Sequence, residues 1–98
     1  MTLEDQVVAK DRLRRAQLEF QNALNLLLWA ERRLRRLPQA EVDAFWGGQG
    51  RRVETTVRAD ATEAVAAFRQ FSAAGLVANA GDRHLVTQAQ RYLAERAV

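Results

Sequence analysis

Few residues of this chain could carry out acid–base or nucleophilic chemistry. Its 98 residues include one histidine, His84, one serine, Ser72, and no cysteine. A nucleophile needs a nearby base and an orienting acid, and a thiolate or imidazole metal site needs several ligands. His84 follows Asp82 near the expected start of a helix, which fits a capping or surface role. We therefore expect no enzyme, no small-molecule substrate, no cofactor and no metal.

Two pairs of carboxylates are close together in sequence. Glu41 and Asp43 are two residues apart, so on a helix they point to different sides. Asp60 and Glu63 stand three apart, in the pattern of a capping box. We interpret the second pair as a helix start and neither pair as an acid–base site.

Gly47-Gly48-Gln49 spells the tripeptide with which class I peptide release factors reach peptidyl-tRNA. The arginines that follow it would suit RNA. The sequence departs from that family because no asparagine follows the glutamine closely and no small mixed sheet is indicated. A release-factor-like protein that acts at the ribosome through Gln49 is a remote alternative.

Arginine supplies fourteen of the fifteen basic residues, and the formal net charge is +3. This balance permits attraction to phosphates without requiring it. Six arginines flank the middle of the chain and would form an anion-binding end: Arg32, Arg33, Arg35, Arg36, Arg51 and Arg52. The alternative function is therefore a basic helical protein that binds nucleic acid, or a phage structural or accessory protein.

A long amphipathic helix over about residues 3–36 must position the first arginines. Its apolar residues are separated alternately by three and four positions, the pattern of a helix packed along another: Leu13, Ala16, Phe20, Ala23, Leu27, Ala30, Leu34 and Leu37. Leu24, Leu26, Leu28 and Trp29 widen the apolar surface beyond that seam. A second neighbour is therefore expected, either the C-terminal helix or another subunit.

The rest of the chain is also expected to be helical. Pro38 interrupts the first helix and begins a short turn or helix over residues 38–45, and a glycine bend follows over 46–50. Residues 51–58 alternate as a strand would, but a lone strand has no partner, so a helix over about 52–79 is favoured. A last helix over about 83–97 would have Asp82 as its N-cap.

The predicted fold is therefore all-α: one domain over residues 1–98, an antiparallel helical hairpin with a short C-terminal helix. Dimerisation would complete it as a bundle. Eight apolar residues are the expected interface: Phe20, Leu24, Leu27, Leu28, Trp29, Leu34, Phe68 and Phe71.

Trp46-Gly47-Gly48 fits Trp-any-Gly at the middle of a chain of about one hundred residues, between two long helical patterns. This organisation resembles the WXG family of small proteins secreted by type VII systems. The resemblance implies a helical hairpin with the Trp-x-Gly turn at its bend, pairing into four-helix bundles, and an export signal that includes Tyr-x-x-x-Asp/Glu in the C-terminal tail. Here Tyr92 precedes Arg96 at that spacing, and Pro38 interrupts the first helix.

The leading hypothesis is a non-enzymatic WXG-like hairpin, secreted or partner-binding, that acts as a homodimer or heterodimer. The longest apolar run, Leu26–Ala30, is far shorter than the ~20 residues of a membrane span. The N-terminus starts acidic and lacks the apolar region of a signal peptide. We expect a protein without a membrane span, located in the cytoplasm or exported without a cleavable signal.

Overall fold

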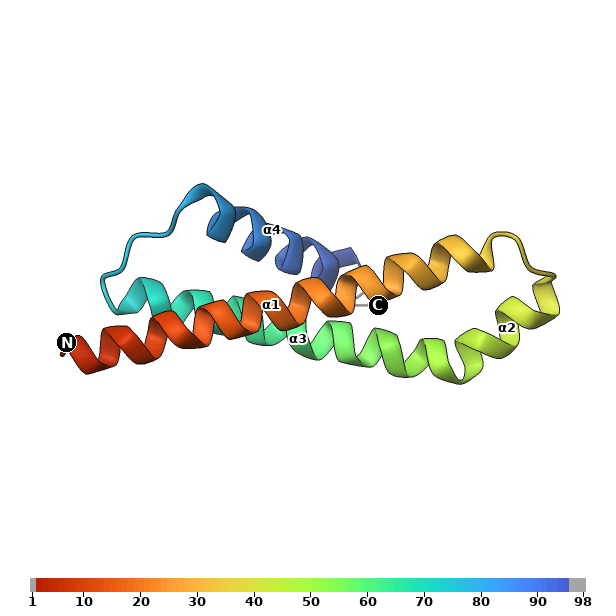
Figure 1. Ribbon diagram of the computed structural model, residues 1–98, viewed down its shortest axis with the longest axis horizontal. Coiled ribbons are helices and arrows are strands. Elements are labelled where there is room, and N and C mark those ends of the chain that lie inside the picture. Colours follow the sequence, from red (N-terminus) through yellow and green to blue (C-terminus); the bar gives the residue numbers. More distant parts are fainter. Residues whose placement is uncertain (1, 96–98) are drawn as a thin grey trace.

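The computed structural model describes residues 2–95, which form four helices. These are α1 (Leu3–Leu34), α2 (Gln39–Gly47), α3 (Gln49–Ala73) and α4 (Ala80–Glu95). Helices α1 and α3 run antiparallel along each other, and α4 lies obliquely on them (Figure 1). No strand occurs between residues 2 and 95, so the predicted all-α hairpin is confirmed and residues 51–58 are helical.

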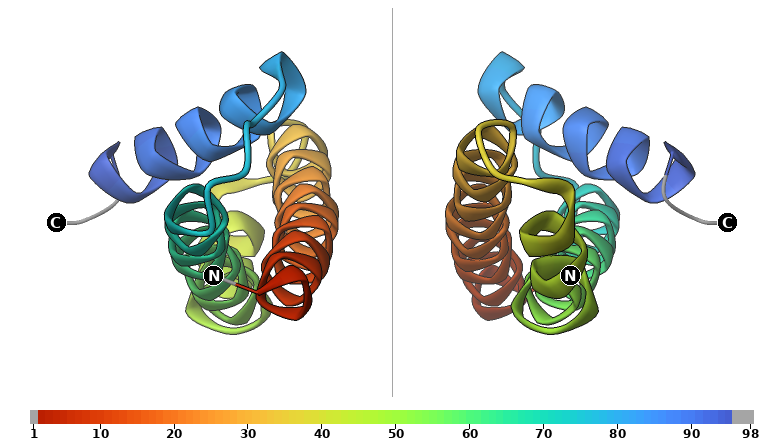
Figure 2. Two further views of the ribbon diagram at one scale, coloured as in Figure 1. Left: turned by 90° about the vertical axis from the view of Figure 1, so that its left-hand side faces the viewer. Right: turned by 90° about the vertical axis from the view of Figure 1, so that its right-hand side faces the viewer.

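The hairpin is long and narrow. Its extents are 55 × 22 × 22 Å, and its radius of gyration is 16.0 Å, against about 13 Å for a compact domain of 100 residues. Helix α4 covers only the half of the hairpin that holds the first part of α1 and the last part of α3 (Figures 1 and 2). The other half is built from the end of α1, from α2 and from the start of α3.

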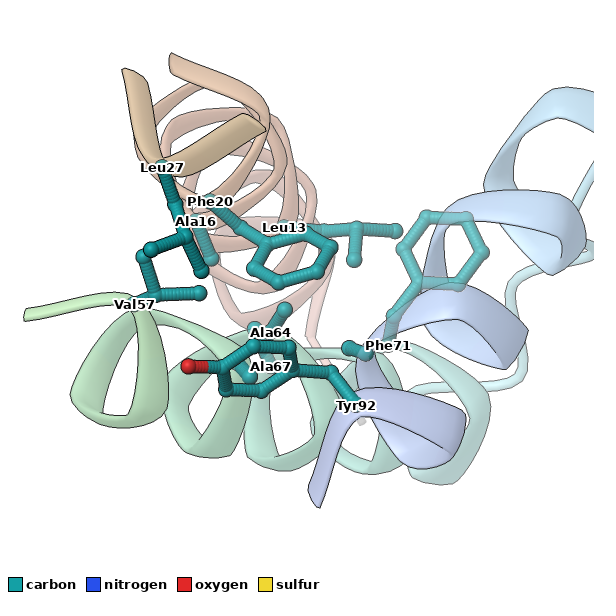
Figure 3. Packing of buried hydrophobic residues seen from close by; sticks show 11 residues of the cluster. Leu13, Ala16, Phe20, Leu27, Val57, Ala64, Ala67, Phe71 and Tyr92 are labelled. Carbon is teal, nitrogen blue, oxygen red and sulfur yellow. The ribbon is translucent and has the colours of Figure 1, made fainter. Parts of the chain in front are cut away.

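The core lies between α1 and α3. Phe20, Leu27 and Val57 have the largest side chains that are fully buried, and small residues of α3 let the two helices approach. In Figure 3, Phe20 from α1 and Tyr92 from α4 point toward the same part of α3, which carries Ala64 and Ala67. The predicted seam is confirmed where α1 is helical, except that Ala23 is half-buried.

The chain reverses at residues 35–38, between α1 and α2 (Figure 1). The backbone N–H groups of Arg36 and Leu37 each donate to a carbonyl three residues earlier, which tightens the end of α1. Pro38 then precedes α2 with a φ of −58°, and its carbonyl accepts from the N–H groups of Glu41 and Val42. The predicted interruption at Pro38 and the short helix after it are therefore confirmed.

The predicted glycine bend over residues 46–50 is wrong. Only Gly48 separates α2 from α3, and helix resumes at Gln49. The reversal comes earlier because Pro38 lacks an N–H and disfavours helical geometry at Leu37. Helix α1 ends at Leu34 rather than at residue 36, and Leu37 is 44% exposed in the turn.

Helix α3 ends at Ala73, six residues before the predicted end at 79. Gly75 has a φ of +78°, its N–H donates to the carbonyl of Ser72, and the N–H of Leu76 donates to the carbonyl of Phe71. This is the Schellman arrangement, in which a glycine in the left-handed region stops a helix. Residues 74–79 connect α3 to α4.

Two predicted helix starts are also wrong. Asn79, not Asp82, caps α4: its side chain accepts from the N–H of Asp82 at 2.8 Å, and the Asp82 carboxylate accepts from the N–H of Asn79 at 3.3 Å. Asp60 and Glu63 lie in the middle of α3, so they form no capping box. The predicted end of the last helix at 97 lies outside the described residues.

Candidate binding surface

Among the exposed large apolar side chains of α1, three in the middle and second half of the helix lie on one face. Leu18, Leu26 and Trp29 are 60%, 52% and 55% exposed. With about 100° of rotation per residue, they fall within about 80° of one another around α1. Fully buried Phe20 and Leu27 lie on the opposite side. We call Leu18, Leu26 and Trp29 the outer ridge; it extends about 16 Å along α1.

The sequence of α1 produces two apolar stripes, and α3 and α4 cover only one of them. Asn22 and Asn25 are exposed between the members of the outer ridge and keep it from being continuously apolar. Exposed large apolar groups that gather on one face, with a tryptophan among them, are typical of contact surfaces for other proteins.

Arg33 contacts Trp29, the last residue of the outer ridge. Its guanidinium carbon lies 4.9 Å from the centre of the Trp29 ring. Because the pair is spaced four residues apart on one helix, the arginine covers part of the indole while its charge stays in water. This contact favours the outward position of the ring.

The eight residues predicted to form an interface divide into three groups. Phe20, Leu27, Leu34 and Phe71 are buried in the chain's own core, so in this structure they are not available to a partner. Leu24 and Phe68 are half-buried against that core. Leu28 and Trp29 remain exposed, but at different angles around α1.

Leu18 was missed as an interface residue, and Leu26 was predicted only to widen the apolar surface of the first helix. A partial signal was present: Leu18, Leu26 and Trp29 are eight and three positions apart, which places them on one side of a helix, opposite the seam. The seam has the more regular spacing, so it was the stripe from which the interface was predicted. Which apolar stripe a helix buries depends on where its neighbours lie.

All six of the arginines expected to bind anions are exposed: Arg32, Arg33, Arg35, Arg36, Arg51 and Arg52. The end of α1 and the start of α3, which carry them, lie at the same end of the hairpin (Figure 1). Arg33 is engaged with Trp29. Phosphate binding by this cluster stays a prediction.

Trp46 has a structural role at the junction of α2 and α3. It is half-buried against the core, and its ring meets that of Phe45 edge to face, with 5.1 Å between centroids and 82° between planes. A Cβ atom added at Gly47 or Gly48 would not clash with any neighbour, whereas Gly50 is buried beneath both rings. The Trp-Gly-Gly motif thus lies eight or more residues beyond the turn at residues 35–38 rather than in it.

Gln49 is the first residue of α3, and its side chain is exposed. The Gly-Gly-Gln tripeptide therefore joins two helices instead of extending from a loop. The release-factor hypothesis stays a prediction, with loss of peptidyl-tRNA hydrolysis on Gln49→Ala as its measurement.

A polar contact joins α1 to α3 through the side chain of Arg12. Arg12 donates from Nε and Nη2 to the two carboxylate oxygens of Glu63, at 2.6 and 3.0 Å, and from Nη1 to Gln70 at 2.6 Å. The hydrogen bond from Arg12 is the main reason why the pKa of Glu63 is lowered and that of Arg12 is raised. We call the paired hydrogen bonds from Arg12 to Glu63 the fork; its role is to hold α1 against α3.

The pKa of the Asp60 carboxyl group on α3 is raised above its usual range. Partial burial is the larger cause, and the negative charge of Glu19 on α1 adds to it. The two carboxylates form no metal site on their own, and no group of three or more histidine, cysteine, aspartate or glutamate side chains is suitably placed for one between residues 2 and 95.

Comparison of the chain with models of protein families, with curated proteins and with solved structures finds no match. Within the described part of the chain, none of the helices has the length and apolarity needed to cross a membrane.

Proposed function

We propose that this protein is a non-enzymatic helical hairpin that acts by binding another protein through the outer ridge of α1. The observation that carries the proposal is Trp29, which is 55% exposed although α1 already packs a buried apolar seam on its other side. An indole that contributes nothing to the core and lies beside Leu26 offers a large apolar area for a partner to bury.

A narrower form of the proposal is a secreted, WXG-like hairpin that pairs with a second one. The two long antiparallel helices and the Trp-Gly-Gly motif favour it. The position of Trp46 beyond the turn, packed over Gly50, does not match the placement that the resemblance implies. The broader proposal rests on the outer ridge and does not depend on secretion.

The exposed arginine cluster favours a second candidate, binding of nucleic acid. Phosphate contacts release counterions, so such binding should weaken steeply as salt increases. Retention of DNA or RNA on filters at low salt, lost when Arg51 and Arg52 are replaced by glutamine, would support this candidate. Retention that is absent at low salt would exclude it.

Site-specific photocrosslinking tests the leading proposal. A photoreactive amino acid replaces Asn25, between the outer-ridge residues, in the full chain produced in its native cells. The matched control carries the same group at Thr62, which is exposed on α3. The proposal predicts one discrete protein adduct from position 25 and none from position 62. Equal adducts from both positions, or none from either, would contradict it.

A further inference from the structure

The outer ridge lies between two pairs of arginines. Arg14 and Arg15 precede Leu18 by one helical turn, Arg32 and Arg33 follow Trp29 by one turn, and all four are exposed. We propose that the partner is an acidic amphipathic helix, with an apolar stripe for the outer ridge and carboxylates at both ends of that stripe. This inference rests on the proposed function and names the chemistry of its partner.

The positive charge of the chain is concentrated in this part of α1. Residues 14–36 contain six arginines and two glutamates, a net charge of +4, in a chain whose total is +3. The rest of the chain is thus slightly acidic. Complementary charge around an apolar contact selects the partner and speeds its association.

Two acidic residues of α1 flank this surface. Asp11 precedes Arg15 by four residues and Glu19 follows it by four, so both reduce the local charge at Arg15. Glu19 also faces Asp60 of α3. Between Glu19 and Glu31, α1 carries no acidic residue, and the uncharged Asn22 and Asn25 occupy exposed positions between Leu18 and Trp29.

A second copy of this chain fits the outer ridge poorly. If two α1 helices paired antiparallel with Leu18 opposite Trp29, Arg14 would face Arg33 and Arg15 would face Arg32. If they paired parallel, each arginine would lie beside its own copy. Like charges held opposite each other oppose association, so both arrangements favour a partner of different sequence.

The dimensions of the outer ridge favour a helical partner. Its residues are eight and three positions apart along about three turns of α1. A helix with apolar residues at i, i+3, i+4 and i+7 can lay a stripe along such a row. Its carboxylates would then reach the arginines at either end.

Fluorescence anisotropy of labelled synthetic helices tests this inference. The probes are an amphipathic peptide of three heptads with leucine at the core positions and glutamate beside them, its lysine counterpart, and a scrambled acidic peptide. With the full chain, only the acidic amphipathic peptide should bind, and more weakly at higher salt. Trp29→Gln should weaken binding about tenfold or more, whereas Val77→Gln, which changes a 90% exposed residue off the outer ridge, should not.

Charge variants separate the specific contact from overall charge. Arg14→Gln with Arg33→Gln should weaken binding about tenfold. Arg69→Gln with Arg91→Gln removes the same charge from exposed positions elsewhere and should change binding less than twofold. Circular dichroism confirms that each variant is folded. Equal effects of the two pairs, or binding of the lysine peptide as strong as that of the acidic one, would overturn the inference.

Three further outcomes would overturn it and remain distinguishable. A dimer in analytical ultracentrifugation that Leu26→Gln abolishes would assign the outer ridge to a second copy and leave the proposed function intact. An oligonucleotide whose binding requires Arg14 and Arg33 but not Trp29 would assign the arginines to nucleic acid. If the acidic peptide fails to bind while position 25 still crosslinks in cells, only the partner's chemistry is wrong; if both fail, the proposed function fails too.

Discussion

The indole of Trp46 fills the space into which a side chain at Gly50 would project. A Cβ atom placed on Gly50 would lie 2.5 Å from Cε3 of Trp46 and 2.6 Å from Cε1 of Phe45. Real Cβ atoms essentially never approach other atoms so closely. The absence of a side chain at Gly50 therefore allows α2 to pack its aromatic residues against the start of α3, and the angle between these helices depends on it.

Gly50→Ala should lower the thermal unfolding midpoint. Overpacking costs about 1–3 kcal/mol, and the better helix propensity of alanine returns at most about 1 kcal/mol. Gly47→Ala is the matched control because a Cβ there meets nothing within 4 Å. Calorimetry should show a decrease for Gly50→Ala alone; equal midpoints for the two variants would refute this account of the α2–α3 junction.

The sequence predicted most of the hairpin because its two long helices follow a simple period. The seam of α1 and the stripe beginning at Val53 both face inward, as their spacing indicates. The turn lies before the predicted glycine bend because Pro38 removes a backbone donor, which ends the first helix. A glycine in a sequence can indicate either a flexible backbone or the close approach of another group. At Gly50, the positions of the Phe45 and Trp46 rings show that close approach applies.

The binding surface was harder to predict than the fold. Phe20 and Trp29 are both large aromatic residues of one helix, yet one is fully buried and the other 55% exposed. Periodicity defines two stripes but does not say which of them α3 covers. The fork between Arg12 and Glu63 joins residues 51 positions apart, and local sequence carries no signal for such a pairing.

Glu63→Gln should destabilise the protein at neutral pH and have no effect in strong acid. The pKa of Glu63 is lowered in the folded state by its hydrogen bond to Arg12. Its contribution is therefore present above the unfolded pKa and is lost as the pH falls through the lower folded value. Urea unfolding from pH 7 to pH 2 measures this. Arg12→Lys keeps the positive charge but loses the paired hydrogen bonds to Glu63. It should therefore retain only part of the stability that the ion pair gives at neutral pH.

A constant difference between wild type and Glu63→Gln across that pH range would contradict the assigned ion pair. It would mean that the variant acts through packing rather than through charge.

Asp60→Asn should stabilise the protein at neutral pH. Because burial and Glu19 raise the pKa of Asp60 in the folded state, the charged carboxylate is less favourable there than in the unfolded chain. The destabilisation develops as the pH rises through the interval between the unfolded and folded pKa values and is absent below it. The gain should therefore vanish in acid, and it should be smaller in a Glu19→Gln background. A variant less stable than wild type at pH 7 would refute the assignment.

Asn79→Ala should loosen the start of α4. The amide side chain accepts from the N–H of Asp82, and removing such an N-cap typically costs about 1 kcal/mol. Amide hydrogen exchange should become faster in the first turns of α4 and stay unchanged in the middle of α1. Asn25→Ala, at an exposed position of α1, is the control. Unchanged exchange in α4 would show that packing alone defines its start.

The central claim is that the outer ridge binds a partner and contributes nothing to the core. The most direct measurement introduces Trp29→Gln into the protein that carries the photoreactive group at position 25, and records both the unfolding midpoint and the yield of adduct. The account predicts a stability change within about 0.5 kcal/mol, as for other surface substitutions, and a yield reduced about tenfold. An unchanged yield, or a loss of stability of about 3–5 kcal/mol as expected for a buried aromatic residue, would contradict it.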